Sequence, residues 1–180
     1  PKDEKALEIG REMGIKHFAL SFAANKEGVD LFREKTTKDS YIISKIESRS
    51  GLINLSGILE SSDAILIDRG DLSRQVPIEK IPFFQRRIIS TARSVDKKVF
   101  VATNLLESMV KSKFPTRAEV NDIVSTQIMG ANGLVLAAET AIGQNPVECV
   151  EMIRKVSKQC ERWTPNTSIN ELLLGKDLQL

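Results

Sequence analysis

Five short apolar runs, separated by helical patterns, constrain the fold of this chain more than any other feature. We predict strands over residues 17–22, 41–46, 64–67, 98–103 and 133–138. We predict helices over residues 2–13, 25–35, 50–61, 83–94, 116–129 and 145–163, and a short one over 169–174. Because parallel strands need a long crossover between them, usually a helix, this alternation predicts an α/β fold with a parallel sheet.

The alternation is compatible with both an open doubly wound sheet and a closed barrel. The first predicted strand is not followed by Gly-x-Gly-x-x-Gly, so the dinucleotide-binding form of the open sheet has no support. Five βα units are too few to close an eight-stranded barrel. The longest predicted loop, residues 68–82, is interrupted by Pro77 and Pro82. Periodicity therefore gives the fold class but not its closure.

The composition is that of a globular protein, with 41% hydrophobic residues and a net charge of +2 over 180 residues. This charge gives no support for nucleic-acid binding, and no apolar run reaches the roughly 20 residues of a membrane helix. Cys149 and Cys160 fall in one predicted helix and cannot pair within it, so we expect a reducing, cytoplasmic location. His17, the only histidine, starts a strand, which disfavours zinc and Ser/His or Cys/His chemistry. The first residue is Pro1 rather than Met, which suggests a piece of a longer polypeptide.

Polar or ionisable residues follow each predicted strand at its carboxyl end, where parallel α/β folds build their sites. These residues are Ser21; Lys45 and Glu47; Asp68, Arg69, Gly70 and Asp71; Thr103 and Asn104; Glu139 and Thr140. Strand ends are often polar for structural reasons alone. Five coincident cases nevertheless favour a functional site at this edge of the sheet.

Two pairs of residues in this set predict specific chemistry. Lys45 and Glu47 are two positions apart, so their side chains share one face of the strand while Ile46 packs on the other. Glu47 and Asp71 follow consecutive strands and predict an Mg²⁺ site, because that ion takes a few protein oxygens and completes its shell with substrate and water. A simple salt bridge at the edge of the sheet would explain the spacing of Lys45 and Glu47 equally well. Acidic residues are also common at such edges in proteins that bind no metal there.

Gly70 and Thr103 extend the candidate site toward a substrate. Gly70 permits close backbone approach, and a helical turn beginning at Asp71 would offer N–H groups to a carboxylate or phosphate. Thr103 offers a hydroxyl for proton relay, although a threonine at a strand end is more often a plain hydrogen-bond partner.

Five motifs between about Ser21 and Val150 resemble the pyruvate kinase family in order and spacing. They are Ile-Ser-Lys-Ile-Glu at 43–47, Arg-Gly-Asp-Leu at 69–72, Ala-Thr at 102–103 with Leu-Glu-Ser-Met at 106–109, Pro-Thr-Arg-Ala-Glu at 115–119, and Glu-Thr-Ala at 139–141 with Gly143. The resemblance implies a TIM-barrel catalytic domain. It makes residues 1–164 a partial barrel with five of the eight strands, followed by a C-terminal tail over 165–180 with a short helix.

The resemblance also implies an activity: transfer of a phosphoryl group between phosphoenolpyruvate and ADP, with Mg²⁺, through a pyruvate enolate. Lys45 would neutralise charge on the phosphoryl group and the enolate, and Glu47 and Asp71 would hold Mg²⁺. The backbone of Gly70 and Asp71 would bind the pyruvate carboxylate, and Thr103 would lie near the carbon that is protonated. The family's K⁺ site is built by earlier barrel strands that are not in this chain.

The chain departs from the family pattern at several positions. The family usually has Ala at the position of Asp68, Gly at that of Ser73 and Gln at that of Asn104, and Ser-Gly where this chain has Ala137-Ala138. It also carries a basic residue near Ala23 and Ala24. An added carboxylate at Asp68 should weaken substrate binding unless it points away or pairs with Arg69 or another cation.

Three hypotheses remain open on these grounds. The first is a pyruvate kinase-type phosphotransferase that is an enzyme when completed by the rest of the barrel. The second is a pseudoenzyme or assembly module that binds a small carboxylate, and the third is an Mg²⁺-dependent pyruvate-enolate aldolase or lyase. Exposed strand edges of a partial barrel predict a homo-oligomer or association with the missing half.

Overall fold

The computed structural model describes residues 2–37 and 39–174. The strands are β1 His17–Leu20, β2 Tyr41–Ile46, β3 Ala64–Asp68, β4 Lys98–Ala102 and β5 Gly133–Val135. The α-helices are α1 Lys2–Glu12, α2 Lys26–Lys35, α3 Arg49–Ile53, α4 Leu55–Ser61, α5 Arg69–Leu72, α6 Ile81–Ser94, α7 Arg117–Ile128, α8 Ala138–Ala141, α9 Pro146–Arg162 and α10 Ile169–Leu174. Two 3-10 helices, η1 Ile78–Lys80 and η2 Glu107–Val110, lie in the connections.

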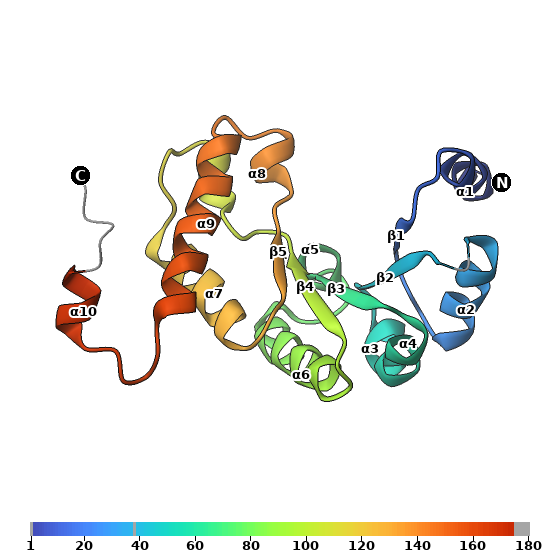
Figure 1. Cartoon of the computed structure of the whole chain (residues 1–180), viewed down its shortest axis with the longest axis horizontal. Coiled ribbons are helices and arrows are strands. Elements are labelled where there is room, and N and C mark those ends of the chain that lie inside the picture. Colours follow the sequence, from blue (N-terminus) through green and yellow to red (C-terminus); the bar gives the residue numbers. More distant parts are fainter. Residues whose placement is uncertain (1, 38, 175–180) are drawn as a thin grey trace.

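The five strands form one parallel sheet in the order β1-β2-β3-β4-β5, which is also their order in the chain. In a doubly wound sheet the strand order reverses at one point, whereas here it does not. Since βα crossovers are right-handed, an unreversed order places the connecting helices on one side of the sheet. Figure 1 shows β1 and β5 well apart at the two ends of the sheet. The arrangement is therefore a segment of a barrel wall, as predicted.

The core lies between the strands and the helices that connect them. Alternate strand residues are fully buried there: Ile42 and Ile46 of β2, Ile65 and Ile67 of β3, Val99 and Val101 of β4. They belong to one cluster with Ile58 and Leu59 of α4 and Ile88 of α6. A second cluster packs Leu105, Leu106 and Met109 against Ile123 of α7 and Cys149 and Val156 of α9. The other face of these strands carries the half-buried Ile43, Leu66 and Phe100, together with Lys45 and Asp68 at the carboxyl ends.

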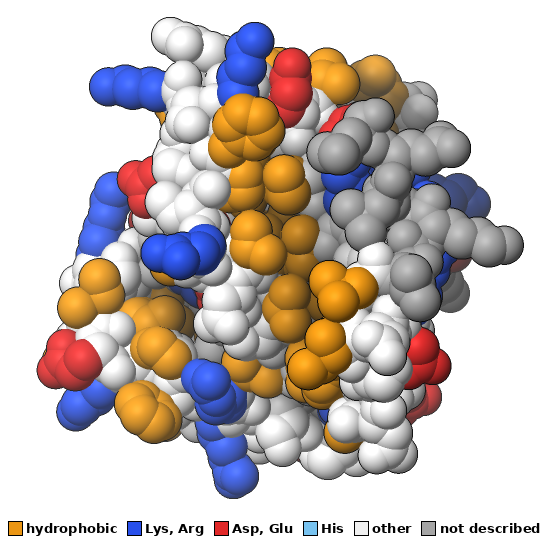
Figure 2. Space-filling model, turned by 90° about the vertical axis from the view of Figure 1, so that its left-hand side faces the viewer, with side chains coloured by type: hydrophobic (Ala, Val, Ile, Leu, Met, Phe, Trp, Pro, Cys, Tyr) orange, Lys and Arg blue, Asp and Glu red, His pale blue; other side chains and the backbone are white. Residues whose placement is uncertain are grey.

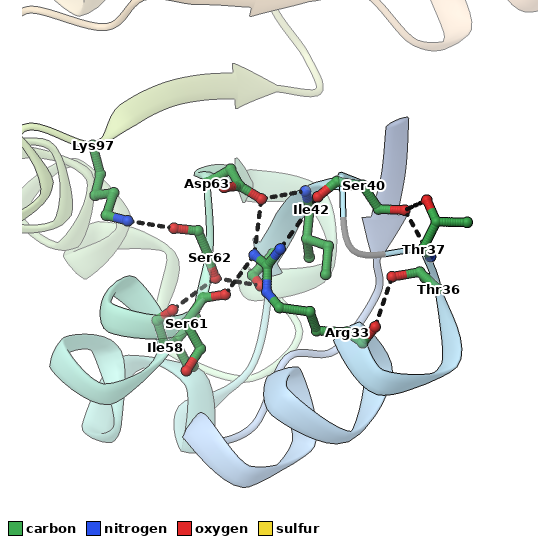
Figure 3. A network of polar contacts seen from close by, with 11 residues as sticks. Arg33, Thr36, Thr37, Ser40, Ile42, Ile58, Ser61, Ser62, Asp63 and Lys97 are labelled. Atoms are coloured by element: carbon green, nitrogen blue, oxygen red, sulfur yellow. Dashed lines mark hydrogen bonds and ion pairs between the residues drawn. The ribbon is translucent and has the colours of Figure 1, made fainter. Parts of the chain in front are cut away.

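A polar network ties the amino ends of the central strands together (Figure 3). Arg33 of α2 donates to the Asp63 carboxylate at 2.8 Å and to the backbone carbonyls of Ser61 and Ser40. Asp63 also accepts the N–H of Ile42 at 2.7 Å. These contacts fix where β2 and β3 begin, at the end of the strands opposite to the predicted site.

The structure differs from the predicted elements most clearly in three places. The helical turn expected to begin at Asp71 is α5 and begins at Arg69, because the Asp68 side chain accepts the N–H of Asp71 and caps the turn, and η1 lies later in the predicted loop. The predicted helix over 50–61 is divided at Asn54, whose side chain donates to the carbonyl of Ala24. The strand predicted over 133–138 ends at Val135, and α8 begins at Ala138.

The C-terminal segment contains the expected short helix, α10. The last part of that segment, residues 175–180, lies outside the described residues. Across the ranges that the structure describes, no helix combines the length and apolar character needed to cross a membrane.

Candidate active site at the carboxyl ends of the strands

Lys45 and Glu47 lie together at the carboxyl end of β2. The Lys45 Nζ is 2.9 Å from the Glu47 Oε2, so the two side chains share a face of the strand as their spacing predicts. Glu47 is fully buried, and its Oε1 accepts the backbone N–H of Phe22 at 2.6 Å. Among the described residues its Oε2 has no geometrically defined hydrogen bond, and it is paired with the ammonium of Lys45. One oxygen of Glu47 is thus fixed by the backbone while the other faces the site.

Asp68, the last residue of β3, completes an ion-pair triad with these two residues. Its Oδ2 is 3.0 Å from the Lys45 Nζ, and its side chain is 12% exposed. The carboxylate therefore neither points away from the site nor pairs with Arg69. It pairs with a cation, Lys45, which was one of the two arrangements expected to spare substrate binding.

The ammonium of Lys45 is held in its charged form by the two carboxylates. Burial by itself would lower the pKa of Lys45, but the contacts with Glu47 and Asp68 outweigh it and raise the pKa above its ordinary value. Lys45 is thus a fixed positive charge in a partly buried site.

Three carboxylates converge in a group that could hold a metal ion. Glu47, Asp68 and Asp71 each offer an oxygen, and these oxygens lie within 4.8 Å of one another. Asp71 comes from α5, directly after β3, and is the most exposed of the three. Carboxylate oxygens are the ligands that Mg²⁺ prefers, and the Oε2 of Glu47, which is paired with Lys45, faces this group. The predicted pair of Glu47 and Asp71 is brought together here, with Asp68 as an unpredicted third member.

Gly70 and Thr103 meet beside this carboxylate group. The N–H of Gly70 donates to the Thr103 Oγ1 at 2.7 Å, and the N–H of Asp71 faces the Asp68 Oδ1 at 3.4 Å. The hydroxyl of Thr103 can donate to the carbonyl of Ala102 at 2.6 Å. Both backbone N–H groups expected to bind a substrate carboxylate thus have internal partners in this structure.

Arg69 supports Thr103 from the side. Its Nη2 and Nε donate to the Thr103 carbonyl at 2.6 and 3.2 Å, and its Nη1 lies 2.6 Å from the Asp122 Oδ2 of α7. Sequence reasoning assigned no role to this pair. Arg69 and Asp122 are 53 positions apart, so nothing in the local pattern indicates that they meet.

Not every strand-end residue belongs to this group. Glu139 of α8 is buried and accepts the backbone N–H groups of Leu106 and Ala137, so it holds the two connections after β4 and β5 together. Asn104 is exposed, with a positive φ of 54°. At the carboxyl end of β1 the N–H of Phe22, a residue with a φ of 52°, donates to Glu47, and Ser21 makes no such contact in the described structure. A positive φ at a phenylalanine carries no sequence signal, so this contact could not be predicted.

The site combines a partly buried ammonium, three carboxylates and a hydroxyl at one edge of the sheet. The carboxylates would hold a metal ion. That ion and the ammonium of Lys45 would then both present positive charge to an anion. Such an arrangement stabilises negative charge that develops on oxygen during enolate formation or phosphoryl transfer.

Comparison with known proteins identifies relatives of this chain. The family model "Pyruvate kinase, barrel domain" matches residues 1–150. A pyruvate kinase of Thermotoga maritima is 41% identical over 164 residues, which are 89% of this chain and 35% of that protein. A pyruvate kinase of Thermococcus litoralis is 37% identical over 96% of this chain and 37% of its own length. The chain thus spans about a third of the length of these curated relatives.

A solved structure shows the same fold. A crystal structure of a pyruvate kinase from Cryptosporidium parvum superimposes with a TM-score of 0.87 and 35% sequence identity. It covers 91% of this chain, and this chain covers 35% of it. The five parallel strands and their helices therefore correspond to part of a TIM barrel.

Proposed function

Because this chain belongs to the pyruvate kinase family, we propose that the full-length protein transfers a phosphoryl group between phosphoenolpyruvate and ADP. The observation that supports this most directly is the convergence of Lys45, Glu47 and Asp71 at the carboxyl ends of β2 and β3. The relatives are about three times as long as the chain. Binding of the nucleotide, by residues outside this chain, and the formation of an oligomer are therefore also proposed.

Mg²⁺ is the metal that the family implies, and the residues present suit it. Glu47 and Asp71 would hold the ion, since both place carboxylate oxygens in one group and one Glu47 oxygen has no hydrogen bond. A bound Mg²⁺ would neutralise the charge on the phosphoryl group and the enolate oxygen and orient the substrate.

Residues of the chain itself would perform the rest of the reaction. Lys45 would place its ammonium against the transferring phosphoryl group and then the enolate oxygen, because it is charged and partly buried. The backbone of Gly70 and Asp71 would bind the carboxylate of phosphoenolpyruvate or pyruvate. Thr103 would hold its hydroxyl, either directly or through a water molecule, near the carbon that takes up a proton.

Substitution of Lys45 tests this assignment. We expect Lys45→Ala in the full-length protein to lower the rate of ATP formation from phosphoenolpyruvate and ADP by at least about 10²- to 10³-fold, as the loss of one strong electrostatic stabiliser does. Lys16→Ala is a matched control, because Lys16 is an exposed lysine paired with Asp39 at the other end of the strands. Near-normal activity of Lys45→Ala would show that the site is wrongly assigned.

The second candidate function is a pseudoenzyme that binds a small carboxylate. It is favoured by two observations: Asp68 pairs with Lys45, and the N–H groups of Gly70 and Asp71 have internal partners. Calorimetric titration of the full-length protein with oxalate, an enolate mimic, in the presence of Mg²⁺ examines ligand binding separately from turnover. Binding of oxalate without any phosphoryl transfer would favour the pseudoenzyme, whereas transfer would exclude it.

A further inference from the structure

The carboxylate of Asp68 contacts the groups that the proposed function assigns to a substrate anion. Its Oδ2 is 3.0 Å from the ammonium of Lys45. Its Oδ1 faces the N–H of Asp71 at 3.4 Å and the hydroxyl of Thr103 at 3.5 Å. A carboxylate of the protein itself therefore lies where the carboxylate or phosphate of a substrate would meet the site.

We propose that Asp68 is an internal competitor of the substrate anion, which binds only after the Asp68 carboxylate has left the ammonium of Lys45. This inference rests on the proposed function, because that function supplies the anion. Asp68 then sets the affinity for the substrate and takes no part in the chemical steps. Alanine, which the family usually has at this position, has no carboxylate and could not compete in this way.

The charges around Lys45 explain why the ion pair with Asp68 opposes an anion. Lys45 is paired with Glu47 at 2.9 Å and with Asp68 at 3.0 Å, so two carboxylates already share one ammonium. The pairing offsets the added charge of Asp68, as expected from the sequence, but it uses the cation that the substrate needs. A substrate that bound with Asp68 still in place would be a third anion on this ammonium. It would also lie against the Asp68 carboxylate, and like charges in contact oppose binding strongly.

The contacts of Asp68 are such that a substrate can displace it. The two contacts of its Oδ1 are longer than the usual hydrogen-bond range of about 2.7–3.2 Å. The hydroxyl of Thr103 also has a closer acceptor, the carbonyl of Ala102 at 2.6 Å. Movement of Asp68 therefore breaks mainly its ion pair with Lys45, and a substrate anion would form an equivalent pair. Lys45 meanwhile keeps its contact with Glu47.

Oxalate binding to the full-length protein tests the inference without any turnover. The affinity is measured by calorimetry, with Mg²⁺ raised until the oxalate affinity no longer changes. We expect Asp68→Ala to bind oxalate about 10- to 100-fold more tightly than the wild type. The apparent affinity of a ligand falls in proportion to the fraction of molecules that are free to bind it, and coupling within a site is typically of this size.

Two further variants separate competition from folding and from bulk charge. Asp68→Asn keeps an acceptor for the N–H of Asp71 but removes the negative charge, so it should bind oxalate at least about fivefold more tightly than the wild type. Asp39→Ala removes an exposed carboxylate that is paired with Lys16, away from the site, and should leave the oxalate affinity unchanged. Circular dichroism of each variant reports folding. If Asp68→Ala does not fold, Asp68→Asn decides the question.

The outcomes for this inference and for the proposed function can be told apart. Equal or weaker oxalate binding by Asp68→Ala, or no oxalate binding by the wild type and both Asp68 variants, would overturn the inference. If phosphoryl transfer is nevertheless observed, the proposed function stands without it. Tighter oxalate binding by Asp68→Ala in a protein that shows no phosphoryl transfer would overturn the proposed function and leave this inference standing. Where transfer occurs, the KM for phosphoenolpyruvate should fall in Asp68→Ala together with the dissociation constant for oxalate.

Discussion

Thr103 has a backbone conformation that a β-branched residue rarely adopts. Its φ is 72°, in the left-handed region, and Asn104 follows with a φ of 54°. Such conformations cost about 1–3 kcal/mol and persist only where neighbouring contacts hold them. Arg69 provides that support with two hydrogen bonds to the Thr103 carbonyl, and the side chain of Arg69 is itself fixed by Asp122. In this conformation the Thr103 Oγ1 lies 2.7 Å from the Gly70 nitrogen.

The hydroxyl of Thr103 has a structural partner as well as its expected role in proton transfer. It accepts the N–H of Gly70 and can donate to the carbonyl of Ala102. A change in activity alone would therefore not distinguish proton transfer from positioning. The stability of the fold and the exchange of pyruvate hydrogens with solvent must therefore be measured separately.

We expect Thr103→Val and Thr103→Ser to separate these two roles. Thr103→Val removes the acceptor of the Gly70 N–H and should lower the free energy of unfolding by about 1 kcal/mol. It should slow the exchange of pyruvate methyl hydrogens with D₂O, followed by NMR, by at least about 10²-fold if the hydroxyl transfers the proton. Thr103→Ser keeps the hydroxyl and should stay close to the wild type in both measurements. Exchange in Thr103→Val as fast as in the wild type would show that the hydroxyl only supports structure.

At the scale of secondary-structure elements, two buried or half-buried glutamates hold the connections around the site. Glu139 of α8 accepts the N–H groups of Leu106 at 2.9 Å and Ala137 at 2.8 Å. Glu119 completes the capping box of α7 and also accepts the N–H and hydroxyl of Ser108. Each carboxylate thus joins the connection after β4 to a second element. These contacts keep the segment that begins at Thr103 in one place.

The pKa of Glu139 makes its contribution dependent on pH. Burial by itself would raise this pKa, but the backbone N–H groups of Leu106 and Ala137 outweigh it and lower the pKa below its ordinary 4.5. A carboxyl group whose pKa is lowered on folding stabilises the folded state above the unfolded pKa. That stabilisation is lost as the pH falls through the folded pKa.

We therefore expect Glu139→Gln to lower the free energy of unfolding at pH 7 by about 1.5–3 kcal/mol, the usual contribution of hydrogen bonds to a charged group. The difference from the wild type should shrink as the pH falls below about 4.5. Urea unfolding at several pH values measures both quantities. Glu79→Gln, a change at an exposed residue of η1, serves as the control and should show neither effect. A destabilisation of Glu139→Gln that is the same at all pH values would contradict the role of its charge.

Local patterns predicted the elements of the fold better than their ends. The two-residue period correctly placed Lys45 and Glu47 on one face and Ile46 in the core, because that period is a property of every strand. The break at Asn54 depends on a contact with Ala24, 30 positions away, and could not be read from the residues around it. The same holds for the N–H of Phe22 that binds Glu47. Long-range contacts, rather than propensity, decided these features.

The members of the candidate site and two of its pairs, Lys45 with Glu47 and Glu47 with Asp71, were predicted, whereas the contacts of Asp68 and Arg69 were not. Lys45, Glu47, Asp71, Gly70 and Thr103 all lie at one edge of the sheet, because the carboxyl ends of parallel strands meet there. The contact of Asp68 with Lys45 could not be derived from the sequence. A side chain at the end of a strand can point toward the site or away from it, and the residues around Asp68 fit both orientations. The support of Thr103 by Arg69 depends on three elements meeting and has no sequence signal.

At the scale of the whole molecule, apolar surface and open sheet edges are exposed together. Within the described sheet, β1 pairs only with β2, and β5 pairs only with β4. Figure 2 shows a band of hydrophobic side chains on the side where α9 and α10 lie. Val147 and Val150 of α9 and Ile169 of α10 are among the exposed large hydrophobic residues, at 69%, 54% and 75%. Open edges and apolar patches of this kind favour association.

We therefore expect the isolated 180-residue chain to self-associate or to be poorly folded. Sedimentation velocity should show species larger than the 20.0 kDa monomer, in proportions that increase with concentration. The double variant Val147→Lys and Val150→Lys introduces charge on the exposed surface of α9, because both valines are exposed there. It should reduce association that involves this surface of α9, whereas pairing through β1 or β5 would be unaffected. A single 20.0 kDa species at all concentrations, with cooperative urea unfolding, would show that these surfaces are tolerated in water and that the barrel segment is stable alone.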